Sequence, residues 1–140
     1  MAMTIHVDIV SAEKEIFSGS VEAVFASAVM GEVGIYPRHT PMLTQLKPGE
    51  VRVLLNGKEE QFYVSGGMLE VQPHIVTVLA DTAMRADDVD EAAALAAKED
   101  AEQALSDNDA KLDYAEAQSK LAEAMAQLRT IDRMRKGANH

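Results

Sequence analysis

The fold is decided by residues 51–64, which read VRVLLNGKEEQFYV. Two runs rich in β-branched and aromatic residues flank the dipeptide Asn56-Gly57. Asn-Gly between such runs is the strongest short-range signal for a β-hairpin, because a type I′ turn requires positive φ at both central residues. Residues 51–55 and 61–64 are therefore predicted to form a pair of antiparallel strands.

Short apolar runs continue on both sides of this hairpin, at residues 5–10, 21–29, 68–71 and 75–80. Turn residues separate them: Ser18-Gly19-Ser20, Gly31-Glu32-Val33-Gly34, Ser65-Gly66-Gly67 and Pro73-His74. Turn signals every ~8–12 residues are typical of an antiparallel sandwich or barrel. No helical stretch of useful length interrupts the runs, which excludes parallel folds built from βαβ units.

The composition changes at residues 85–88, where Asp87 and Asp88 are expected to cap a helix. Good helix formers continue from Val89 to Leu105, residues 106–109 form a turn, and a second helix is predicted from about Asp113 to Lys136. Two helices with a short loop between them make an antiparallel hairpin. The fold class is therefore α+β, with an antiparallel β-sandwich in residues 1–86 followed by a C-terminal α-helical hairpin in residues 87–140.

Apolar residues of the second helix recur at spacings of three and four, which predicts the seam of the hairpin. The seam residues are Tyr114, Leu121, Met125, Leu128 and Ile131. Most other residues on the contact face are alanines, which bury little apolar area. Such a seam is expected to be only marginally stable, so that the helices can separate or dock again.

The second helix ends in a basic tip, which consists of Arg129, Arg133, Arg135 and Lys136. Basic residues at a helix C-terminus are explained by the helix dipole. A basic tip on an acidic protein can also bind an acidic partner. The sequence leaves both explanations open.

Composition excludes several functions. The net charge is −10, from 13 basic and 23 acidic residues, which is the wrong sign for binding nucleic acid or anionic membranes. No apolar run approaches the ~18 residues of a membrane span. Cysteine is absent, which excludes disulfides and thiolate chemistry. The four histidines, His6, His39, His74 and His140, have no metal-site spacing, and no phosphate-binding glycine motif occurs. We therefore expect no enzyme, metal or cofactor.

Three segments resemble a known family. Residues 31–44 read GEVGIYPRHTPMLT and resemble the G-E-L-G-I-x-P-G-H-A-P-L-L-T signature of the epsilon subunit of F-type ATP synthases. Residues 65–73, SGGMLEVQP, are similar to that family's S-G-G-x-L-E-V-Q-P segment, and IVTVLADTAMR at residues 75–85 follows with the expected spacing. The similarity spans the whole chain.

The resemblance implies a rotor subunit rather than a catalyst. A sandwich of about ten strands would sit at the foot of the central stalk, against the gamma subunit and the membrane ring of c subunits. The helical hairpin would lie folded or extend into the head of alpha and beta subunits, where it inhibits ATP hydrolysis. A bacterial subunit of this kind is peripheral, at the cytoplasmic face of the cell (inner) membrane, and does not insert into it.

The resemblance also assigns residues. Glu32, Arg38 and His39 would contact the ring or gamma, with Arg38 standing where the family commonly has glycine. Nucleotide-sensing members resemble I/L-D-x-x-R-A at the first helix, whereas Ala93 occupies the arginine position here. Arginine suits phosphate through its rigid fork of donors. The chain is therefore expected to bind ATP weakly or not at all, with Asp90, Arg129 and Arg133 as the remaining contacts.

Two other classes of protein stay open on the sequence alone. A small ligand-sensing or protein-interaction module without a rotor role would need a phosphate or metal site, and none is visible. An enzyme would need converging acid, base or nucleophile residues, and the scattered histidines argue against it.

Overall fold

The hairpin around Asn56-Gly57 forms as the sequence predicts. In the computed structural model, which describes residues 3–106 and 114–138, β5 (Met42–Leu55) pairs antiparallel with β6 (Lys58–Val64). The φ angles of Asn56 and Gly57 are 54° and 75°. Both are positive, as a type I′ turn requires.

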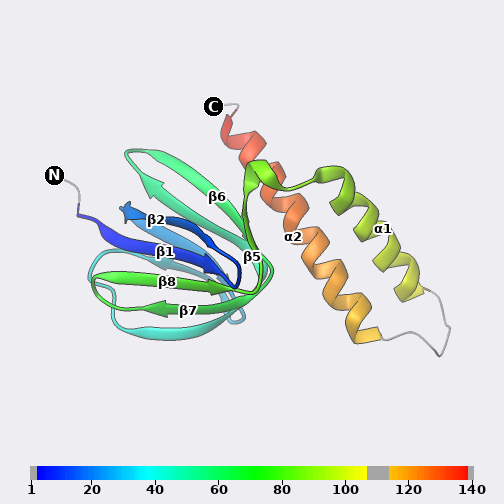
Figure 1. Cartoon of the computed structure of the whole chain (residues 1–140), viewed down its shortest axis with the longest axis horizontal. Helices are drawn as coiled ribbons and strands as arrows, with labels where there is room; N and C mark the ends of the chain where they lie inside the picture. Colours follow the sequence, from blue (N-terminus) through cyan, green and yellow to red (C-terminus); the bar gives the residue numbers. More distant parts are fainter. Residues whose placement is uncertain (1–2, 107–113, 139–140) are drawn as a thin grey trace.

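Nine strands curl into a sandwich within the described residues (Figure 1), against the expected number of about ten. The strand order is β2-β1-β8-β7-β5-β3-β4, and β6 pairs with both β5 and β9. The remaining strands are β1 (Ile5–Ser11), β2 (Glu15–Val21), β3 (Ala23–Ala28), β4 (Gly31–Ile35), β7 (Gly67–Val71), β8 (Ile75–Ala80) and β9 (Ala83–Arg85).

The long strand β5 belongs to both layers of the sandwich. Residues 42–46 pair with β7, whereas residues 49–55 pair with β6. Opposite β3, the register jumps so that Ala26 faces Val51 and Ala28 faces Leu46. The bulge contains Pro48, which has no N–H to donate to a ladder. The chain therefore turns from one layer to the other at this point.

One strand pair departs from the antiparallel expectation. β1 and β8 are parallel, with Val7 opposite Val76 and Ile9 opposite Val78. Parallel neighbours need a long connection, and here strands β2 to β7 make the connection. The side chains of these four residues all point into the core.

The core fills the space between the layers with aliphatic side chains and one phenylalanine. Its members alternate along each strand, as a half-buried strand requires. They include Ile5, Val7, Ile9, Val21, Val24, Ile35, Leu46, Val51, Val53, Phe62, Val64, Leu69, Val71, Val76 and Val78.

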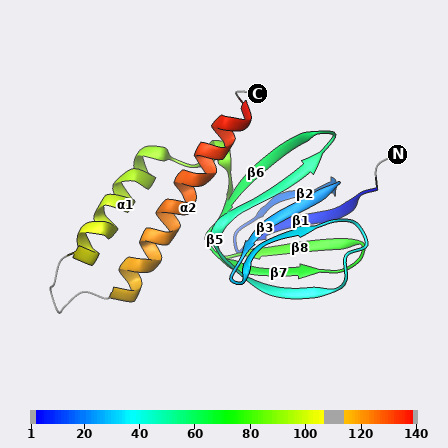
Figure 2. The ribbon, with the colours of Figure 1, turned by 180° about the vertical axis from the view of Figure 1, so that it is seen from behind.

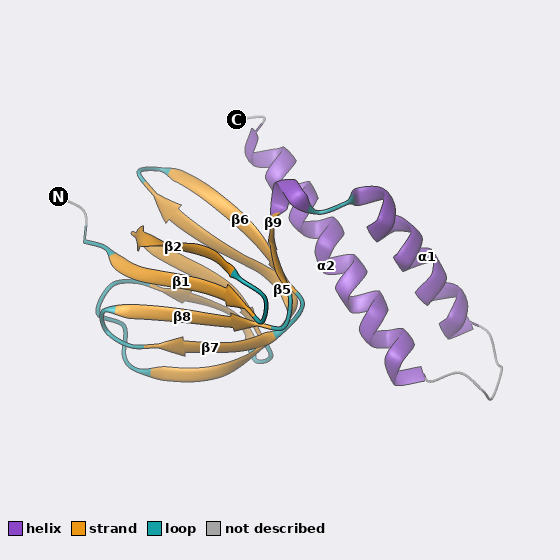
Figure 3. Ribbon diagram, in the orientation of Figure 1, coloured by secondary structure: helices purple, strands orange, loops and turns teal. Residues whose placement is uncertain are grey.

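The helical hairpin lies on one side of the sandwich, next to β5 (Figure 2). Helix α2 (Tyr114–Ala138) contacts β5 and β6, and α1 (Glu91–Ser106) packs on the far side of α2 (Figure 3). The expected α+β architecture, a β-sandwich followed by a helical hairpin, is confirmed.

The start of α1 differs from the prediction. Asp87 and Asp88 lie in a short 3₁₀ turn, η1 (Ala86–Asp88), and do not cap α1. The cap is Asp90, whose Oδ1 accepts the backbone N–H of Ala93 at 3.1 Å. Val89 is predicted to lie inside the helix, but it precedes the helix and is buried, where it packs with Tyr63 of the sandwich. Because Val89 is buried against the sandwich, the linker is longer than predicted and α1 begins at Glu91.

Gly67 supports a testable prediction about the fold. Its φ is 141°, and a Cβ there would lie 2.0 Å from the carbonyl oxygen of Leu79 on β8. Gly67→Ala should lower the free energy of unfolding by at least about 2 kcal/mol, through backbone strain and overpacking together. Gly31→Ala is the matched control, because φ is 124° there and nothing lies within 4 Å. Equal losses in urea unfolding would contradict a specific close approach at Gly67.

Candidate functional site: the docking face of the helical hairpin

The C-terminal half of α2 docks on the outer face of β5 and β6 through a small apolar cluster. Tyr63 of β6 is 1% exposed and packs with Val89, Ala126 and Ile131. Beside it, Thr130 is fully buried and donates its hydroxyl to the carbonyl of Ala126 at 2.8 Å, so that its polar atom is satisfied within the helix. A cluster of this size buries far less apolar area than the sandwich core.

Tyr63 is the centre of this cluster and carries its polar group into the contact. Burial raises the pKa of Tyr63 to about 12, and the nearby charge of Glu123 adds to that effect. A hydrogen bond with Gln127 acts in the opposite direction. Glu123 and Gln127 both belong to α2, so the phenol of Tyr63 lies against the helix and not in solvent.

An ion pair closes the rim of the docking face. Arg133 Nε lies 2.7 Å from Glu50 Oε1, and the Glu50 side chain is only 13% exposed. Burial raises the pKa of Glu50, while the charges of Arg133 and Arg52 oppose the rise. Oε2 of Glu50 has no hydrogen-bond partner among the described residues. The docking contact therefore contains a carboxylate whose burial is only partly compensated.

A second ion pair ties the two helices together. Arg135, near the end of α2, donates Nη1 to Glu91 Oε1 at 3.1 Å, at the first residue of α1. This hydrogen bond is the main cause of the lowered pKa of Glu91. Both side chains are exposed, so solvent and salt screen the pair strongly.

Three of the four residues of the basic tip thus form ion pairs within the chain. Arg133 pairs with Glu50, Arg135 with Glu91, and Lys136 with Asp132 at 3.1 Å. Arg129 is exposed and has no ion pair among the residues that the structure describes. Of these pairs, only that of Arg133 ties α2 to the sandwich, because Arg135 joins α2 to α1 and Lys136 pairs within α2.

The expected seam is divided between two surfaces. Alanines make the contact between α1 and α2, where Ala94, Ala101, Ala117 and Ala124 are buried. Ile131 packs on the sandwich instead, and Leu121 and Leu128 are half-buried.

Tyr114 is 61% exposed and Met125 38%, which corrects the prediction that both lie in the seam. One apolar stripe cannot face both α1 and the sheet, so α2 uses small residues toward one and Ile131 toward the other.

The residues expected to contact ring or gamma lie on and after β4. Glu32 is on that strand and forms an ion pair with Arg52 of β5. Arg38 and His39 follow in the loop, where the Nδ1 atom of His39 is 2.7 Å from the carbonyl of Thr40. Arg38 has a φ of 66°, and its backbone N–H donates to the carbonyl of Pro73 at 3.0 Å. All three are surface residues, but Glu32 already has a partner within the chain.

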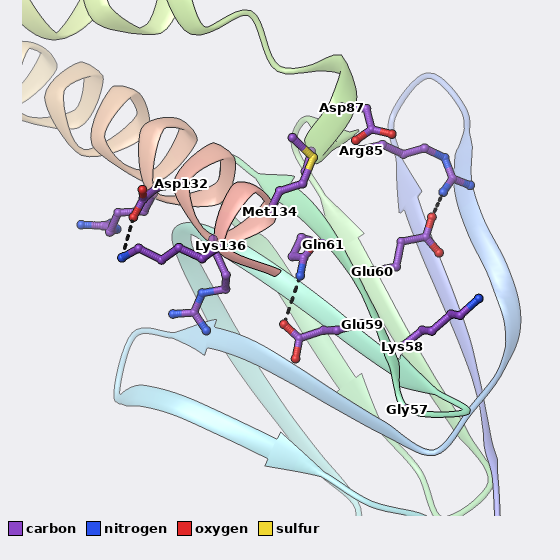
Figure 4. Close-up of a pocket in the computed structure, with 13 residues that line it drawn as sticks. Gly57, Lys58, Glu59, Glu60, Gln61, Arg85, Asp87, Asp132, Met134 and Lys136 are labelled. Carbon is purple, nitrogen blue, oxygen red and sulfur yellow. Dashed lines mark hydrogen bonds and ion pairs between the residues drawn. The ribbon is translucent and has the colours of Figure 1, made fainter. Parts of the chain in front are cut away.

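The structure brings together two of the three expected nucleotide contacts, but not the third. Arg129 and Arg133 line a groove of about 1070 Å³ between the end of α2 and the β5–β6 hairpin (Figure 4). Asp90 is not among its lining residues and is occupied in capping α1. Arg85, Glu59, Glu60 and Asp132 give the groove walls of mixed charge, and Arg85 pairs with Glu60. Five basic and four acidic residues line the groove, so its cations are interspersed with carboxylates that would repel phosphates.

Sequence reasoning missed a cluster of serine, histidine and aspartate on β1 and β2. His6 Nε2 lies 2.9 Å from Asp8 Oδ1 and 3.3 Å from Ser18 Oγ, and Ser18 donates to Asp8 at 2.6 Å. The bond from Ser18 is the main reason that the pKa of Asp8 is lowered. In a catalytic triad, one imidazole nitrogen faces serine and the other aspartate. Here a single nitrogen faces both, so the cluster cannot work as a triad.

Across residues 3–106 and 114–138, no group of three or more potential ligands could hold a metal ion. None of the helices in this part of the chain is long and apolar enough for a membrane span. The fold and the docking face define a β-sandwich protein that carries a docked helical hairpin.

Comparison with known proteins identifies the family. A family model described as the β-sandwich domain of the ATP synthase delta/epsilon chain matches residues 4–86. A second, described as the long α-helix domain of the same chain, matches residues 87–132. The chain belongs to the ATP synthase delta/epsilon chain family.

Similar curated proteins carry the same description. The ATP synthase epsilon chain of Nitrosococcus oceani is 71% identical over 137 residues, covering 97% of this chain and 98% of that one. ATP synthase epsilon chain 1 of Methylococcus capsulatus is 63% identical over 138 residues, covering 98% and 99%.

Solved structures agree in fold. One is a chain from a cryo-EM structure of the Euglena gracilis mitochondrial ATP synthase with OSCP, F1 and c-ring. It has a TM-score of 0.71 at 21% identity and covers 98% of this chain and 82% of that one. A chain from the Tetrahymena thermophila central stalk and c-ring has a TM-score of 0.64 at 15% identity, covering 93% and 98%.

Arg38 supports a prediction about this site. A left-handed φ costs a residue with a Cβ about 1–2 kcal/mol, and glycine avoids that cost. Glycine also has more conformational freedom in the unfolded chain, which lowers the free energy of unfolding by about 0.4–1 kcal/mol. Arg38→Gly should therefore raise the free energy of unfolding by up to about 1 kcal/mol in urea titrations. Arg38→Ala, which removes the guanidinium but keeps Cβ, is the control and should change little. A gain shared by both variants would assign the effect to charge and not to the backbone.

Proposed function

We propose that this chain is a central-stalk rotor subunit of a bacterial F-type ATP synthase. The observation that carries the proposal is the 71% identity to an ATP synthase epsilon chain over nearly the full length of both proteins. The subunit is non-catalytic, binds no cofactor, and couples the catalytic head to the proton-driven ring. It is peripheral, at the cytoplasmic face of the cell (inner) membrane.

We further propose that residues 1–86 and 87–140 have separate tasks. The sandwich binds the gamma subunit and the ring of c subunits, with Glu32, Arg38 and His39 on the ring side. The hairpin regulates, and reaches the alpha and beta subunits when it extends. The small apolar cluster at Tyr63 supports this division, because a thin contact lets two arrangements lie within a few kcal/mol of each other.

An exposed apolar surface on the layer opposite α2 is suited to gamma. Met68 of β7 lies opposite Leu79 of β8, and they are 37% and 50% exposed. Val10 of β1 extends this row, and Leu43 of β5 is 66% exposed nearby on the same layer. Adjacent exposed apolar residues on a soluble protein indicate an interface with another protein. We assign this surface to gamma.

Leu79→Asp tests the assignment in the full-length chain. Burying one leucine contributes about 1.5–3 kcal/mol, so we expect a loss of gamma affinity of roughly tenfold to a hundredfold. Leu95→Asp is the matched control, since Leu95 is 45% exposed on α1. Titration calorimetry with purified gamma measures both, and circular dichroism checks that both variants fold. Equal affinities would refute the assignment.

The regulatory role predicts that removing the residues after Asp109 raises ATP hydrolysis by the assembled complex while assembly is kept. The tip can be dissected further, because Arg129 alone among its members has no ion pair in the described part of the docked chain. Arg129→Ala should relieve inhibition without loosening the hairpin.

Arg135→Ala is the comparison, because it breaks the pair with Glu91 and should loosen the hairpin. Unchanged hydrolysis in the truncated complex would leave the hairpin without an inhibitory role.

A further inference from the structure

Glu50 is an acidic residue in the contact between α2 and the sandwich. It lies on the outer face of β5, opposite Tyr63 of β6 in the antiparallel ladder. Packing of Tyr63 with Ala126 and Ile131 seats α2 on this face, and the Glu50 side chain is only 13% exposed there. Docking therefore takes a carboxylate out of water, which costs free energy unless the protein replaces the lost hydrogen bonds.

The docked helix replaces the interactions with water only in part. Arg133 of α2 faces Oε1 of Glu50 through Nε at 2.7 Å, and the Arg133 side chain is 45% exposed. Oε2 is buried and has no hydrogen-bond partner among the described residues. The phenol of Tyr63 is hydrogen-bonded with Gln127 of α2 instead. One carboxylate oxygen of Glu50 is thus paired, and the other loses its hydration without a replacement.

The charges around Glu50 do not remove this cost. The charged side chains that face it are Arg133 of α2, Arg52 of β5, Glu32 of β4 and Glu59 of β6. Burial has the largest effect and raises the pKa of Glu50, the two arginines lower it, and the two glutamates raise it again. Tyr63 faces the same contact but stays neutral, because its own pKa is raised to about 12. Neutralising Glu50 therefore favours the docked arrangement.

We propose that Glu50 is a release element for the hairpin: its carboxylate opposes the docking of α2, and docking tightens whenever Glu50 is neutral. In the undocked chain, water hydrates the ionised carboxylate and the cost of burial does not arise. In the docked chain, a proton taken from solvent removes the charge that the contact hydrates poorly. Arg133 recovers part of the cost and does not reverse it, as is common for buried ion pairs.

Docking of α2 is accordingly tighter in acid. Because the docked state raises the pKa of Glu50 above that of an exposed glutamate, docking takes up protons. The contribution of neutral Glu50 is fully present below the ordinary pKa of glutamate and is lost as the pH rises through the raised value. At neutral and alkaline pH the carboxylate is ionised, and the hairpin is held least firmly.

This linkage is a property of the isolated chain. It rests on the proposed function only for its consequence, because release of the hairpin is what the regulatory role requires. Arg133 belongs to the basic tip, so the side chain that pairs with Glu50 in the docked state becomes available to another molecule when α2 leaves. One poorly hydrated carboxylate thus keeps the tip from being held too firmly.

Thiol labelling measures the docking equilibrium. The chain has no cysteine, and Ala126 is 1% exposed in the docking cluster. In an Ala126→Cys background, a pyridyl disulfide reacts when α2 lifts off, and the labelling rate reports the open fraction even when it is small. Ala122 is exposed on the same helix, so labelling of Ala122→Cys corrects for the change of thiol reactivity with pH.

Glu50→Gln is the main variant, because it keeps the shape of the side chain and removes its charge. At about pH 8, where glutamate is ionised, it should lower the corrected labelling rate by about twofold to tenfold. Glu70→Gln is the matched control, since Glu70 is an exposed carboxylate on β7, away from the docking face, and it should change the rate little. A rate for Glu50→Gln equal to or above the control would overturn the proposal, because the pair with Arg133 would then outweigh burial.

The pH profile is a second test. From about pH 8 to about pH 5.5, the corrected labelling rate should fall in the chain with Glu50 and change less in Glu50→Gln. Arg133→Gln should loosen α2 more at the upper end of this range than at the lower, because Glu50 without its partner is protonated more easily. A flat profile in the presence of Glu50, or equal profiles with and without it, would overturn the proposal.

Hydrogen exchange of the backbone amides of α2 avoids the introduced thiol. In the cysteine-free chain, protection corrected for intrinsic exchange should rise in acid, and at about pH 8 it should be greater in Glu50→Gln. Protection that is unchanged in both comparisons would overturn the proposal. The acid profile needs no substitution, so it holds even for a variant that folds poorly.

Binding of gamma, measured by titration calorimetry, separates this proposal from the rotor assignment. Failure of the labelling and exchange tests leaves gamma binding intact. Failure of the rotor assignment abolishes gamma binding and leaves the effect of Glu50 on docking unchanged. The two proposals can therefore be told apart.

Discussion

The contact between α2 and the outer face of β5 and β6 is the interaction on which the behaviour of the whole chain depends. It combines a few apolar side chains around Tyr63 with one half-buried carboxylate, Glu50, that shares its charge with Arg133. The sandwich has a larger core of its own between its layers. The hairpin depends on it, since its interhelical seam is made of alanines. The sandwich therefore supplies most of the stability of the fold, and the docking of the hairpin is the part that can change.

The parts of the fold that local chemistry determines could be predicted from the sequence. Asn56-Gly57 specified a turn with two positive φ angles, and alternating apolar residues specified strands with one buried face. The parallel pairing of β1 with β8 could not be predicted, because nothing local distinguishes a parallel neighbour from an antiparallel one. The cap of α1 was misplaced because Val89, which is suited to a helix, is buried against Tyr63 instead. At this residue, packing against the sandwich outweighs the propensity to form a helix.

The candidate site was predicted less completely. The sequence shows the basic residues of α2 directly, but their partners Glu50 and Glu91 lie on segments distant in sequence. The spacing of apolar residues predicts one surface on α2, whereas a helix between a sheet and another helix needs two. Arg38 could be noticed only through the family resemblance, and its left-handed backbone required coordinates. Pairings across the fold are what a single sequence hides.

The parallel pairing of β1 and β8 has a consequence for how the chain is made. β1 leaves the ribosome first, yet the neighbour that completes one of its two ladders is among the last strands to appear. Contacts between such distant segments slow folding, because a large loop must close before they contribute. Until β8 arrives, the emerging chain presents a half-paired edge strand and an open apolar interior. The sandwich therefore cannot close during early synthesis, and the acidic character of the chain helps to keep the nascent intermediate from associating with its neighbours.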